Sequence, residues 1–176
     1  MVNEQAGTDL YVSWPEYHQL IERLAVQIYD SAWNFQSILC LARGGLRVGD
    51  VLSRIFDVPL AVLAVSSYAG DRQRGEINFS EQLTFARPPL NANVLVVDDL
   101  VDSGMTLAAT LPWLQEHHHI LQDQCRTAVL WYKQVSCIEP DYYVEYLPTN
   151  PWIHQPFEEY ESQPVDKLVE CYRQKK

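Results

Sequence analysis

Val94-Leu95-Val96-Val97-Asp98-Asp99-Leu100-Val101-Asp102-Ser103-Gly104-Met105-Thr106-Leu107 is the stretch that decides the fold of this chain. Its first four residues are apolar and three of them are β-branched, which favours a short strand buried on both faces. Two aspartates then end the strand. Because side chains alternate along a strand, we expect Asp98 and Asp99 to point to opposite sides of it.

A turn of small residues follows the acid pair. Ser103-Gly104-Met105-Thr106 leads into an apolar segment, Leu107 to Leu114, that starts like a helix. Small residues at a helix N-terminus leave backbone N–H groups available to phosphate oxygens, and the helix dipole adds to the attraction. The stretch therefore offers carboxylates, for ribose hydroxyls or a magnesium ion, beside a site for a phosphate group.

This run resembles the phosphoribosyl pyrophosphate motif of the type I phosphoribosyltransferases: a hydrophobic strand, paired acids, two residues, then Asp-Ser/Thr-Gly-x-Thr. The resemblance implies their α/β fold, a mainly parallel sheet flanked by helices, with a small C-terminal hood or flap. Two other interpretations stay open, namely the metal pocket of another α/β phosphotransfer domain and the DDxxD motif of prenyl synthases. The acids of prenyl synthases lie on a helix, and the strand-like run Val94 to Val97 argues against a helix here.

Length and composition are those of a globular protein. The 176 residues are 47% hydrophobic, which suffices for a single domain with its own core. We expect one phosphoribosyltransferase domain over residues 1–176, with the core at about 11–147 and the hood and tail at about 148–176. The net charge of -10 disfavours nucleic-acid binding. The apolar runs are shorter than the ~20 residues of a membrane span and no signal pattern opens the sequence, so we expect a cytoplasmic protein.

Cysteines and histidines form no recognisable metal motif. The four cysteines are far apart and make no C-x-x-C pair, which favours reduced thiols over disulfides or a zinc site. Neighbouring residues of a helix point in different directions, so His117-His118-His119 is expected to be a solvated helix end.

Helix and strand patterns alternate along the rest of the chain. We expect helices over residues 13–30, 46–56 and from 164 onward, and strands over 37–41, 60–66, 126–132 and 142–146. Ser13 and Glu16 form a capping box at the start of the first helix. Strands alternating with helices predict a mainly parallel sheet, whose ligands bind at the carboxyl ends of the strands.

A second anion site follows the strand at 37–41. Ala42-Arg43-Gly44-Gly45 combines backbone amides with a guanidinium group, both suited to phosphate. The segment resembles the pyrophosphate loop of the same family, which implies that Arg43 and Gly44 bind the diphosphate.

The apolar rhythm fades between Ser67 and Pro89, where glycines and charged residues gather. The pattern predicts a long loop, which in a compact domain is usually a lid or an insertion. Ser66-Ser67-Tyr68 followed by Arg74 resembles the mobile catalytic loop of the family, which implies a diphosphate contact for Arg74. A solvated hairpin is the alternative.

The segment Pro148 to Glu158 is rich in proline and aromatic residues, and we expect neither helix nor strand there. A tryptophan–isoleucine pair followed by Gln-Pro-aromatic, after a strand that ends in lysine, resembles the bacterial xanthine-guanine phosphoribosyltransferases. This resemblance covers about Tyr11 to Phe157. It implies that Lys133 donates to the C6 oxygen of a purine, that Trp152 stacks on the base, and that the backbone of Ile153 bonds its C2 side.

The resemblance implies a purine-salvage enzyme that transfers the phosphoribosyl group from phosphoribosyl pyrophosphate to N9 of a 6-oxopurine. It assigns the ribose hydroxyls to Asp98 and Asp99, a Mg²⁺ ion to Asp99, the general base to Asp102, and the 5′-phosphate to Ser103, Gly104, Met105 and Thr106. A homodimer or homotetramer is expected because the family commonly forms them.

Several points stay open at this stage. His154 stands where the xanthine-guanine group carries an acid, so the choice among guanine, xanthine and hypoxanthine is undecided. Gln163 to Lys176 extends beyond the resemblance and is expected to be structural or an oligomer contact. The alternatives in function are a regulatory nucleotide-binding protein of the same fold and a phosphoribosyltransferase for another base.

Overall fold

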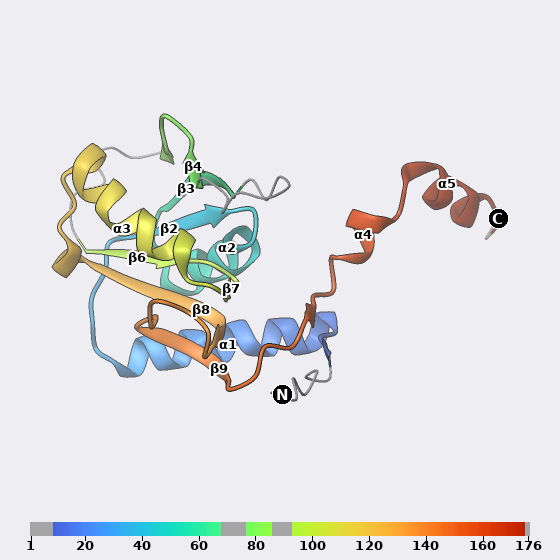
Figure 1. Cartoon of the computed structure of the whole chain (residues 1–176), viewed down its shortest axis with the longest axis horizontal. Helices are drawn as coiled ribbons and strands as arrows, with labels where there is room; N and C mark the ends of the chain where they lie inside the picture. The colour runs from blue at the N-terminus through green and yellow to red at the C-terminus, as the bar shows by residue number, and fades with distance from the viewer. Residues whose placement is uncertain (1–8, 68–76, 86–92, 175–176) are drawn as a thin grey trace, which may run out of the picture. The chain divides into compact units, whose positions relative to one another are not determined.

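The structure, a computed structural model, describes residues 9–67, 77–85 and 93–174. The chain forms two compact units, and Figure 1 labels most of their helices and strands. The small unit comprises residues 1–19 and 151–176, and the large unit comprises residues 20–150. The boundary falls within helix α1, Trp14–Asp30.

An eight-stranded sheet forms the centre of the large unit. Its strands run in the order β4-β3-β2-β6-β8-β7, with β5 paired to β3 and β9 paired to β8. The strands are β2 Ser37–Ala42, β3 Leu60–Ser67, β4 Ile77–Phe79, β5 Thr84–Phe85, β6 Val94–Val97, β7 Leu100–Val101, β8 Cys125–Lys133 and β9 Tyr142–Leu147. β4 and β5 are antiparallel to β3 and the other pairs are parallel. The predicted mainly parallel α/β sheet is confirmed.

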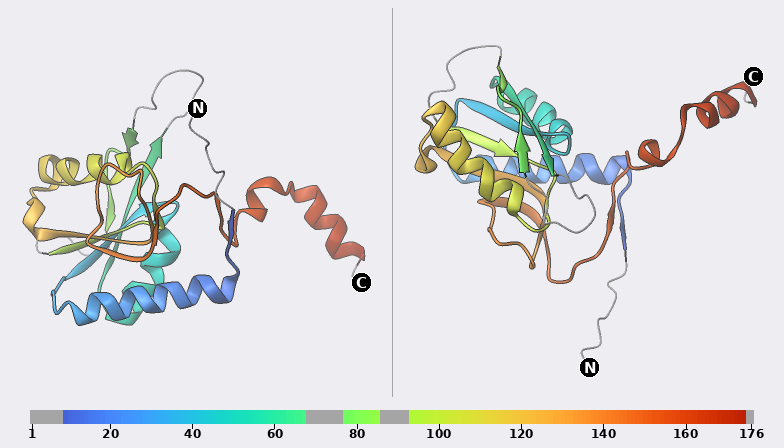
Figure 2. Two further views of the ribbon diagram at one scale, coloured as in Figure 1. Left: turned by 60° about the horizontal axis from the view of Figure 1, so that its bottom comes forward. Right: turned by 45° about the horizontal axis from the view of Figure 1, so that its top comes forward.

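Helices cover both faces of this sheet. α2, Gly45–Phe56, connects β2 to β3, and α3, Met105–His118, connects β7 to β8 through the short helix η1, Gln122–Gln124. Side chains of β2 alternate between the two faces: Cys40 faces α2, whereas Leu39 joins the cluster that packs under α3. Figure 2 shows α2 and α3 on opposite faces, with the large-unit part of α1 on the same face as α2.

The apolar runs of the sequence form the core of the large unit. All four residues of β6 are buried, as expected for a strand covered on both faces. The apolar residues that recur at helical spacing along α1 are also buried: Leu20, Ile21, Leu24, Ala25 and Ile28. The predicted helices and strands over residues 13–30, 37–41, 46–56, 60–66, 126–132 and 142–146 are therefore confirmed, with ends that differ by a residue or two.

The segment predicted as a long loop contains strands. β4 and β5 both pair with β3, which agrees with the hairpin alternative, although residues 68–76 and 86–92 lie outside the described part. The prediction that the segment Pro148 to Glu158 contains no strand was also wrong, because Ile153–His154 forms β10. Strands of two or three residues give too few positions for an alternation of side chains to be recognised.

The small unit is built around a two-stranded parallel sheet, in which β10 pairs with β1, Leu10–Tyr11. The predicted capping box opens α1: the Ser13 backbone N–H and hydroxyl donate to Glu16 Oε2 at 2.8 and 2.6 Å. The unit continues into α4, Glu159–Ser162, and the expected terminal helix α5, Val165–Gln174.

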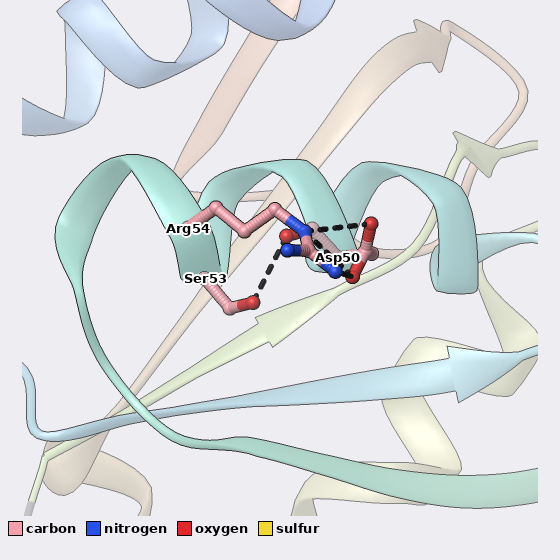
Figure 3. A network of polar contacts seen from close by, with 3 residues as sticks. All are labelled: Asp50, Ser53 and Arg54. Atoms are coloured by element: carbon pink, nitrogen blue, oxygen red, sulfur yellow. Dashed lines mark hydrogen bonds and ion pairs between the residues drawn. The ribbon is translucent and has the colours of Figure 1, made fainter.

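Polar contacts link side chains of α2 to one another and to its backbone. On α2, Arg54 pairs with Asp50 at 3.0 Å and the Ser53 hydroxyl donates to the Asp50 carbonyl at 2.9 Å (Figure 3). Exposed ion pairs of this kind contribute about 0.2–1 kcal/mol each. Among the described residues, no helix combines the length and the apolar content that crossing a membrane requires.

Gly49 provides a test of the packing between α2 and the sheet. A Cβ atom at Gly49 would overlap the sulfur of Cys40. Replacing glycine by alanine within a helix normally stabilises by about 1 kcal/mol. Because of the overlap, we expect Gly49→Ala to lower the free energy of unfolding by about 1–3 kcal/mol in urea denaturation. Adding Cys40→Ala should relieve the overlap and make the double variant more stable than Gly49→Ala alone. A single variant as stable as the parent would contradict this packing.

Candidate active site

Three loops of the large unit lie at the carboxyl edge of the sheet. β2, β6 and β8 are adjacent parallel strands, so their carboxyl ends lie at the same edge. Arg43 and Gly44 follow β2, Asp98 and Asp99 follow β6, and Lys133 is the last residue of β8. Charged groups from segments far apart in the sequence are thereby brought to the position where ligands of parallel sheets bind.

The carboxylates of Asp98 and Asp99 converge on Gly44. A Cβ atom at Gly44 would lie 2.7 Å from Asp98 Oδ1 and closer still to Asp99 Oδ1. The expectation that the two acids point to opposite sides was therefore wrong. The physical reason is that β6 ends at Val97, so the alternation of the strand does not extend to the aspartates.

Of the two carboxyl groups, that of Asp98 has a shifted pKa. Its Oδ1 accepts a hydrogen bond from the Asp99 backbone N–H at 2.9 Å. Burial, and after it the neighbouring charge of Asp99, raise the pKa of Asp98 well above its ordinary value. Two carboxyl groups held this closely favour a proton or a cation between them.

The loop after β2 holds its glycines close to these acids. The peptide bond between Ala42 and Arg43 is cis, and Gly45 packs against the backbone carbonyl of Val97. The side chain of Arg43 is exposed. Arg74, the other arginine assigned to the diphosphate, lies outside the described residues.

The turn from Asp102 to Thr106, called here the phosphate turn, leads directly into α3. Gly104 precedes the helix with φ +78°, a left-handed conformation that glycine adopts without penalty. The Met105 backbone N–H lies 3.4 Å from the Ser103 hydroxyl oxygen, and no side chain caps the helix at Gly104. The first turn of α3 therefore presents the backbone N–H groups and the positive dipole end that bind anions.

Asp102 and Lys133 form an ion pair beside this turn. Lys133 Nζ lies 3.2 Å from Asp102 Oδ1, and Lys133 is only 4% exposed whereas Asp102 is exposed. A buried ammonium group requires an anionic partner because desolvation of an unpaired charge is costly. The site thus places the buried ammonium group of Lys133, a hydrogen-bond donor, next to the exposed carboxylate of Asp102, an acceptor.

A segment that the sequence did not single out supports the phosphate turn. The Cys137 backbone N–H donates to the Ser103 carbonyl at 2.9 Å. A Cβ atom at Gly104 would overlap the Ser136 hydroxyl and lie 2.8 Å from Ile138. In the sequence, the glycine at position 104 was the only sign that another segment packs against the phosphate turn. It did not identify residues 136–138 as that segment.

The remaining residues assigned to the base belong to the small unit. Trp152 is 62% exposed and its ring N–H lies 3.4 Å from Glu158 Oε2, while the Ile153 side chain is buried. Leu10 and Val12 donate to the carbonyls of Trp152 and His154. Because backbone groups alternate along a strand, the N–H and C=O of Ile153 point away from β1.

His154 is held by carboxylates and by an aromatic ring. Its Nε2 lies 3.1 Å from Asp9 and its Nδ1 lies 3.4 Å from Glu158. The imidazole stacks on Tyr11 with ring centroids 4.3 Å apart. A pocket of about 850 Å³ lies on this face, lined by Tyr11, Val12, Ser13, Glu16, Trp152, His154, Gln155, Pro156, Glu158, Glu159 and Glu161.

Comparison with known proteins identifies the family. The profile of the phosphoribosyl transferase domain matches residues 7–162. The chain belongs to the phosphoribosyltransferase family. The family resemblance and the fold predicted from the motif are thus confirmed, and the protein is a pentosyltransferase.

Individual relatives of this phosphoribosyltransferase act on purines. The xanthine-guanine phosphoribosyltransferase of Idiomarina loihiensis is 28% identical over 154 residues, which are 87% of this chain and 89% of that protein. The structure of a purine phosphoribosyltransferase from Pyrococcus horikoshii is 27% identical, with a TM-score of 0.65 over 86% of this chain and 95% of that chain. The xanthine-guanine-hypoxanthine phosphoribosyltransferase of Helicobacter pylori, 23% identical, shares the fold with a TM-score of 0.72 over 88% and 99% of the two chains.

The residues of this phosphoribosyltransferase fit the Mg²⁺ ion that the family implies. Among the described residues there is no group of three or more His, Cys, Asp or Glu side chains arranged to hold a metal. Asp98 and Asp99 are an oxygen-only pair with a shared site at Gly44. Mg²⁺ is commonly held by one or two carboxylates while substrate phosphates and water supply its other ligands. The pair therefore suits a metal that enters with its substrate.

Gly44 tests the geometry of the acid pair. In Gly44→Ala the new Cβ atom would displace both carboxylates, and a misplacement of about 1 Å typically costs about 10²-fold in rate. We expect kcat/KM for phosphoribosyl pyrophosphate to fall by about that factor. Arg54→Ala, an exposed change near the other end of α2, is the control and should stay within about twofold of the parent. Parent-like kinetics for Gly44→Ala would show that the close approach is unimportant.

Proposed function

We propose that the protein transfers the 5-phosphoribosyl group from phosphoribosyl pyrophosphate to N9 of a 6-oxopurine (guanine, xanthine or hypoxanthine), with release of pyrophosphate, as a step of purine salvage. The observation that carries the proposal is the Lys133–Asp102 pair, a buried ammonium 3.2 Å from an exposed carboxylate. The pair adjoins the N-terminus of α3, so a nucleotide with its phosphate at the helix end would bring its base toward these two groups.

The Lys133–Asp102 pair is complementary to one edge of a 6-oxopurine. An ammonium group only donates hydrogen bonds and a carboxylate only accepts them. The C6 oxygen and N7 lie side by side on a purine, so Lys133 donates to the oxygen while Asp102 accepts from a protonated N7. Adenine would place a donating amino group against the ammonium. The pair therefore favours 6-oxopurines over adenine.

The chemistry requires positioning and charge neutralisation more than covalent catalysis. A bond forms between N9 and the anomeric carbon as the bond from that carbon to the pyrophosphate oxygen breaks. Asp102 takes the N7 proton as general base, so the purine reaches the product state neutral, and in the reverse direction Asp102 returns it.

The other assignments follow the three loops at the edge of the sheet. Asp98 and Asp99 contact the ribose hydroxyls, and the amides of Ser103, Gly104, Met105 and Thr106 bind the 5′-phosphate. Arg43, Gly44 and Arg74 bind the diphosphate. Asp99 is the side-chain ligand of Mg²⁺, which when bound neutralises charge on the departing pyrophosphate.

Trp152 and Ile153 of the small unit are assigned to the base. The exposure of the Trp152 ring supports stacking on a flat purine, and the outward direction of the Ile153 backbone groups supports hydrogen bonds to the C2 side. The purine specificities named for the relatives point the same way. His154 and the carboxylates that hold it leave the preferred 6-oxopurine to be measured.

We further propose that the enzyme acts in the cytoplasm as a homodimer or homotetramer, and that it does not bind nucleic acid. The net charge of -10 supports the last point. Light scattering of the purified protein gives the number of subunits directly, and a monomer would refute the oligomer.

The direct test of the function is a panel of bases. The protein is incubated with phosphoribosyl pyrophosphate and Mg²⁺ and, separately, hypoxanthine, guanine, xanthine, adenine, orotate and uracil, and nucleotide formation is followed. Turnover with one or more 6-oxopurines is expected. Turnover only with adenine would refute the assignment of Lys133, and turnover only with a pyrimidine would refute the assignments of both Lys133 and Trp152. Nucleotide binding without turnover would favour a regulatory protein of the same fold.

Asp102→Asn tests the general base. The amide keeps the shape of the side chain and cannot take the proton, so we expect turnover to fall by roughly 10²–10⁴-fold. Binding of phosphoribosyl pyrophosphate, measured by calorimetry, should persist. Unchanged turnover would remove Asp102 from the mechanism.

Lys133→Met tests recognition of the C6 oxygen. Methionine has a similar volume and no donor, so the preference for 6-oxopurines over adenine should erode by about 10-fold or more, since each lost hydrogen bond to a charged group is worth about 1.5–3 kcal/mol. The ratio of kcat/KM values for the preferred 6-oxopurine and adenine measures the effect. A variant that keeps the parental ratio would assign the preference to other residues.

A further inference from the structure

The connection between β8 and β9 is a turn locked by its own hydrogen bonds. The Ser136 backbone N–H donates to the Lys133 carbonyl at 3.0 Å. The Ser136 hydroxyl donates to the Ile138 carbonyl at 2.7 Å and accepts from the Ile138 backbone N–H at 3.2 Å. One hydroxyl therefore uses both its donor and its acceptor capacity to fix the shape of this turn.

This supporting turn, Lys133–Ile138, is in contact with the phosphate turn along its length. Lys133 pairs with Asp102 at 3.2 Å, and the Cys137 backbone N–H donates to the Ser103 carbonyl at 2.9 Å. Cys137 Sγ lies 3.9 Å from Met105 Sδ. Asp102, Ser103 and Met105 of the phosphate turn thus each have a partner in the supporting turn.

Gly104 completes the contact. A Cβ atom there would overlap the Ser136 hydroxyl and would lie 2.8 Å from Ile138 Cγ2 and 3.2 Å from the Cys137 nitrogen. The backbone of the phosphate turn at Gly104 therefore packs directly against the Ser136 and Ile138 side chains and the Cys137 backbone of the supporting turn. Any change in the shape of one backbone is transmitted to the other.

We propose that Ser136 is a positioning residue for the phosphate turn: by fixing the supporting turn, it holds the amides of Ser103 to Thr106 in the arrangement that binds phosphoribosyl pyrophosphate. The inference rests on the proposed function, since it takes the 5′-phosphate to bind at these amides. It adds Ser136, a residue outside the phosphoribosyl pyrophosphate motif that acts through the backbone of the supporting turn.

The first test separates substrate binding from general stability. We expect Ser136→Ala to raise KM for phosphoribosyl pyrophosphate by roughly tenfold, a change of 1.4 kcal/mol, because the supporting turn loses both hydroxyl hydrogen bonds. KM for the purine should stay within about twofold, as Lys133 is retained. Ser53→Ala is the matched control, since that hydroxyl is also half-buried and donates to a carbonyl, that of Asp50, on α2 (Figure 3). Its kinetics should equal those of the parent.

The second test uses Cys137 in the otherwise unmutated turn as a reporter. Cys137 and Cys171 are exposed, whereas Cys40 and Cys125 are buried. Burial raises the pKa of Cys40 to about 12 and that of Cys125 to about 11, so both react slowly with thiol reagents. Iodoacetamide is added in the absence of a purine base, and the rate of Cys137 labelling is measured by peptide mass spectrometry. The labelling rate of Cys171 serves as an internal control.

Phosphoribosyl pyrophosphate with Mg²⁺ should slow the labelling of Cys137 and leave Cys171 unchanged. At a ligand concentration about ten times Kd the protection should approach roughly tenfold. An unprotected Cys137 in a protein that binds the ligand, or a Ser136→Ala variant with the parental KM, would overturn the inference while leaving the proposed function intact. A protein that neither binds phosphoribosyl pyrophosphate nor turns over would overturn both.

Discussion

The pairing of β6 with β2 on one side and β8 on the other is the constraint on which the site depends. β6 has only four residues, all buried, and each is held in register by parallel neighbours on both sides. A slip of one residue would exchange the side chains that pack against its two covered faces, so close packing on both faces specifies the register. With the register fixed, the acids after Val97, the glycines after Ala42 and the lysine that ends β8 reach the same edge. The sheet thereby brings charged groups from distant segments together at one edge.

Much of this arrangement was predictable from the sequence because its signals were long or chemically specific. Buried strands of four or more apolar residues and helices with a regular stripe identified β2, β3, β6, β8, α1 and α2. The acid pair followed by Asp-Ser-Gly-x-Thr identified the family, which the match over residues 7–162 confirms. Parallel topology then implied that Asp98 and Lys133 lie at the same edge of the sheet, and the Lys133–Asp102 contact agrees with that.

The details that escaped prediction share a physical cause: they depend on where a regular element stops or on what approaches it in space. Asp98 and Asp99 turn to the same side because β6 ends one residue earlier than the alternation requires. β1, β7 and β10 have two residues each, too few to show a period. Ser136 and Cys137 support the phosphate turn through backbone contacts, which cannot be predicted from the types of their side chains. Sequence patterns report the periodicity of elements, whereas these features arise from endings and close approaches.

The pairing of β1 with β10 gives residues 10–12 an unexpected importance. Leu10 and Val12 donate to the carbonyls on either side of Ile153, at 2.8 and 3.0 Å, and Tyr11 stacks on His154. β10, which directly follows Trp152, therefore has its only sheet partner, among the described residues, in a segment more than half a sequence away. A shortened start or a bulky fusion placed directly before Leu10 would loosen the aromatic segment near the other end of the chain. Recombinant versions of this protein should accordingly keep their additions at the carboxyl end, beyond Gln174.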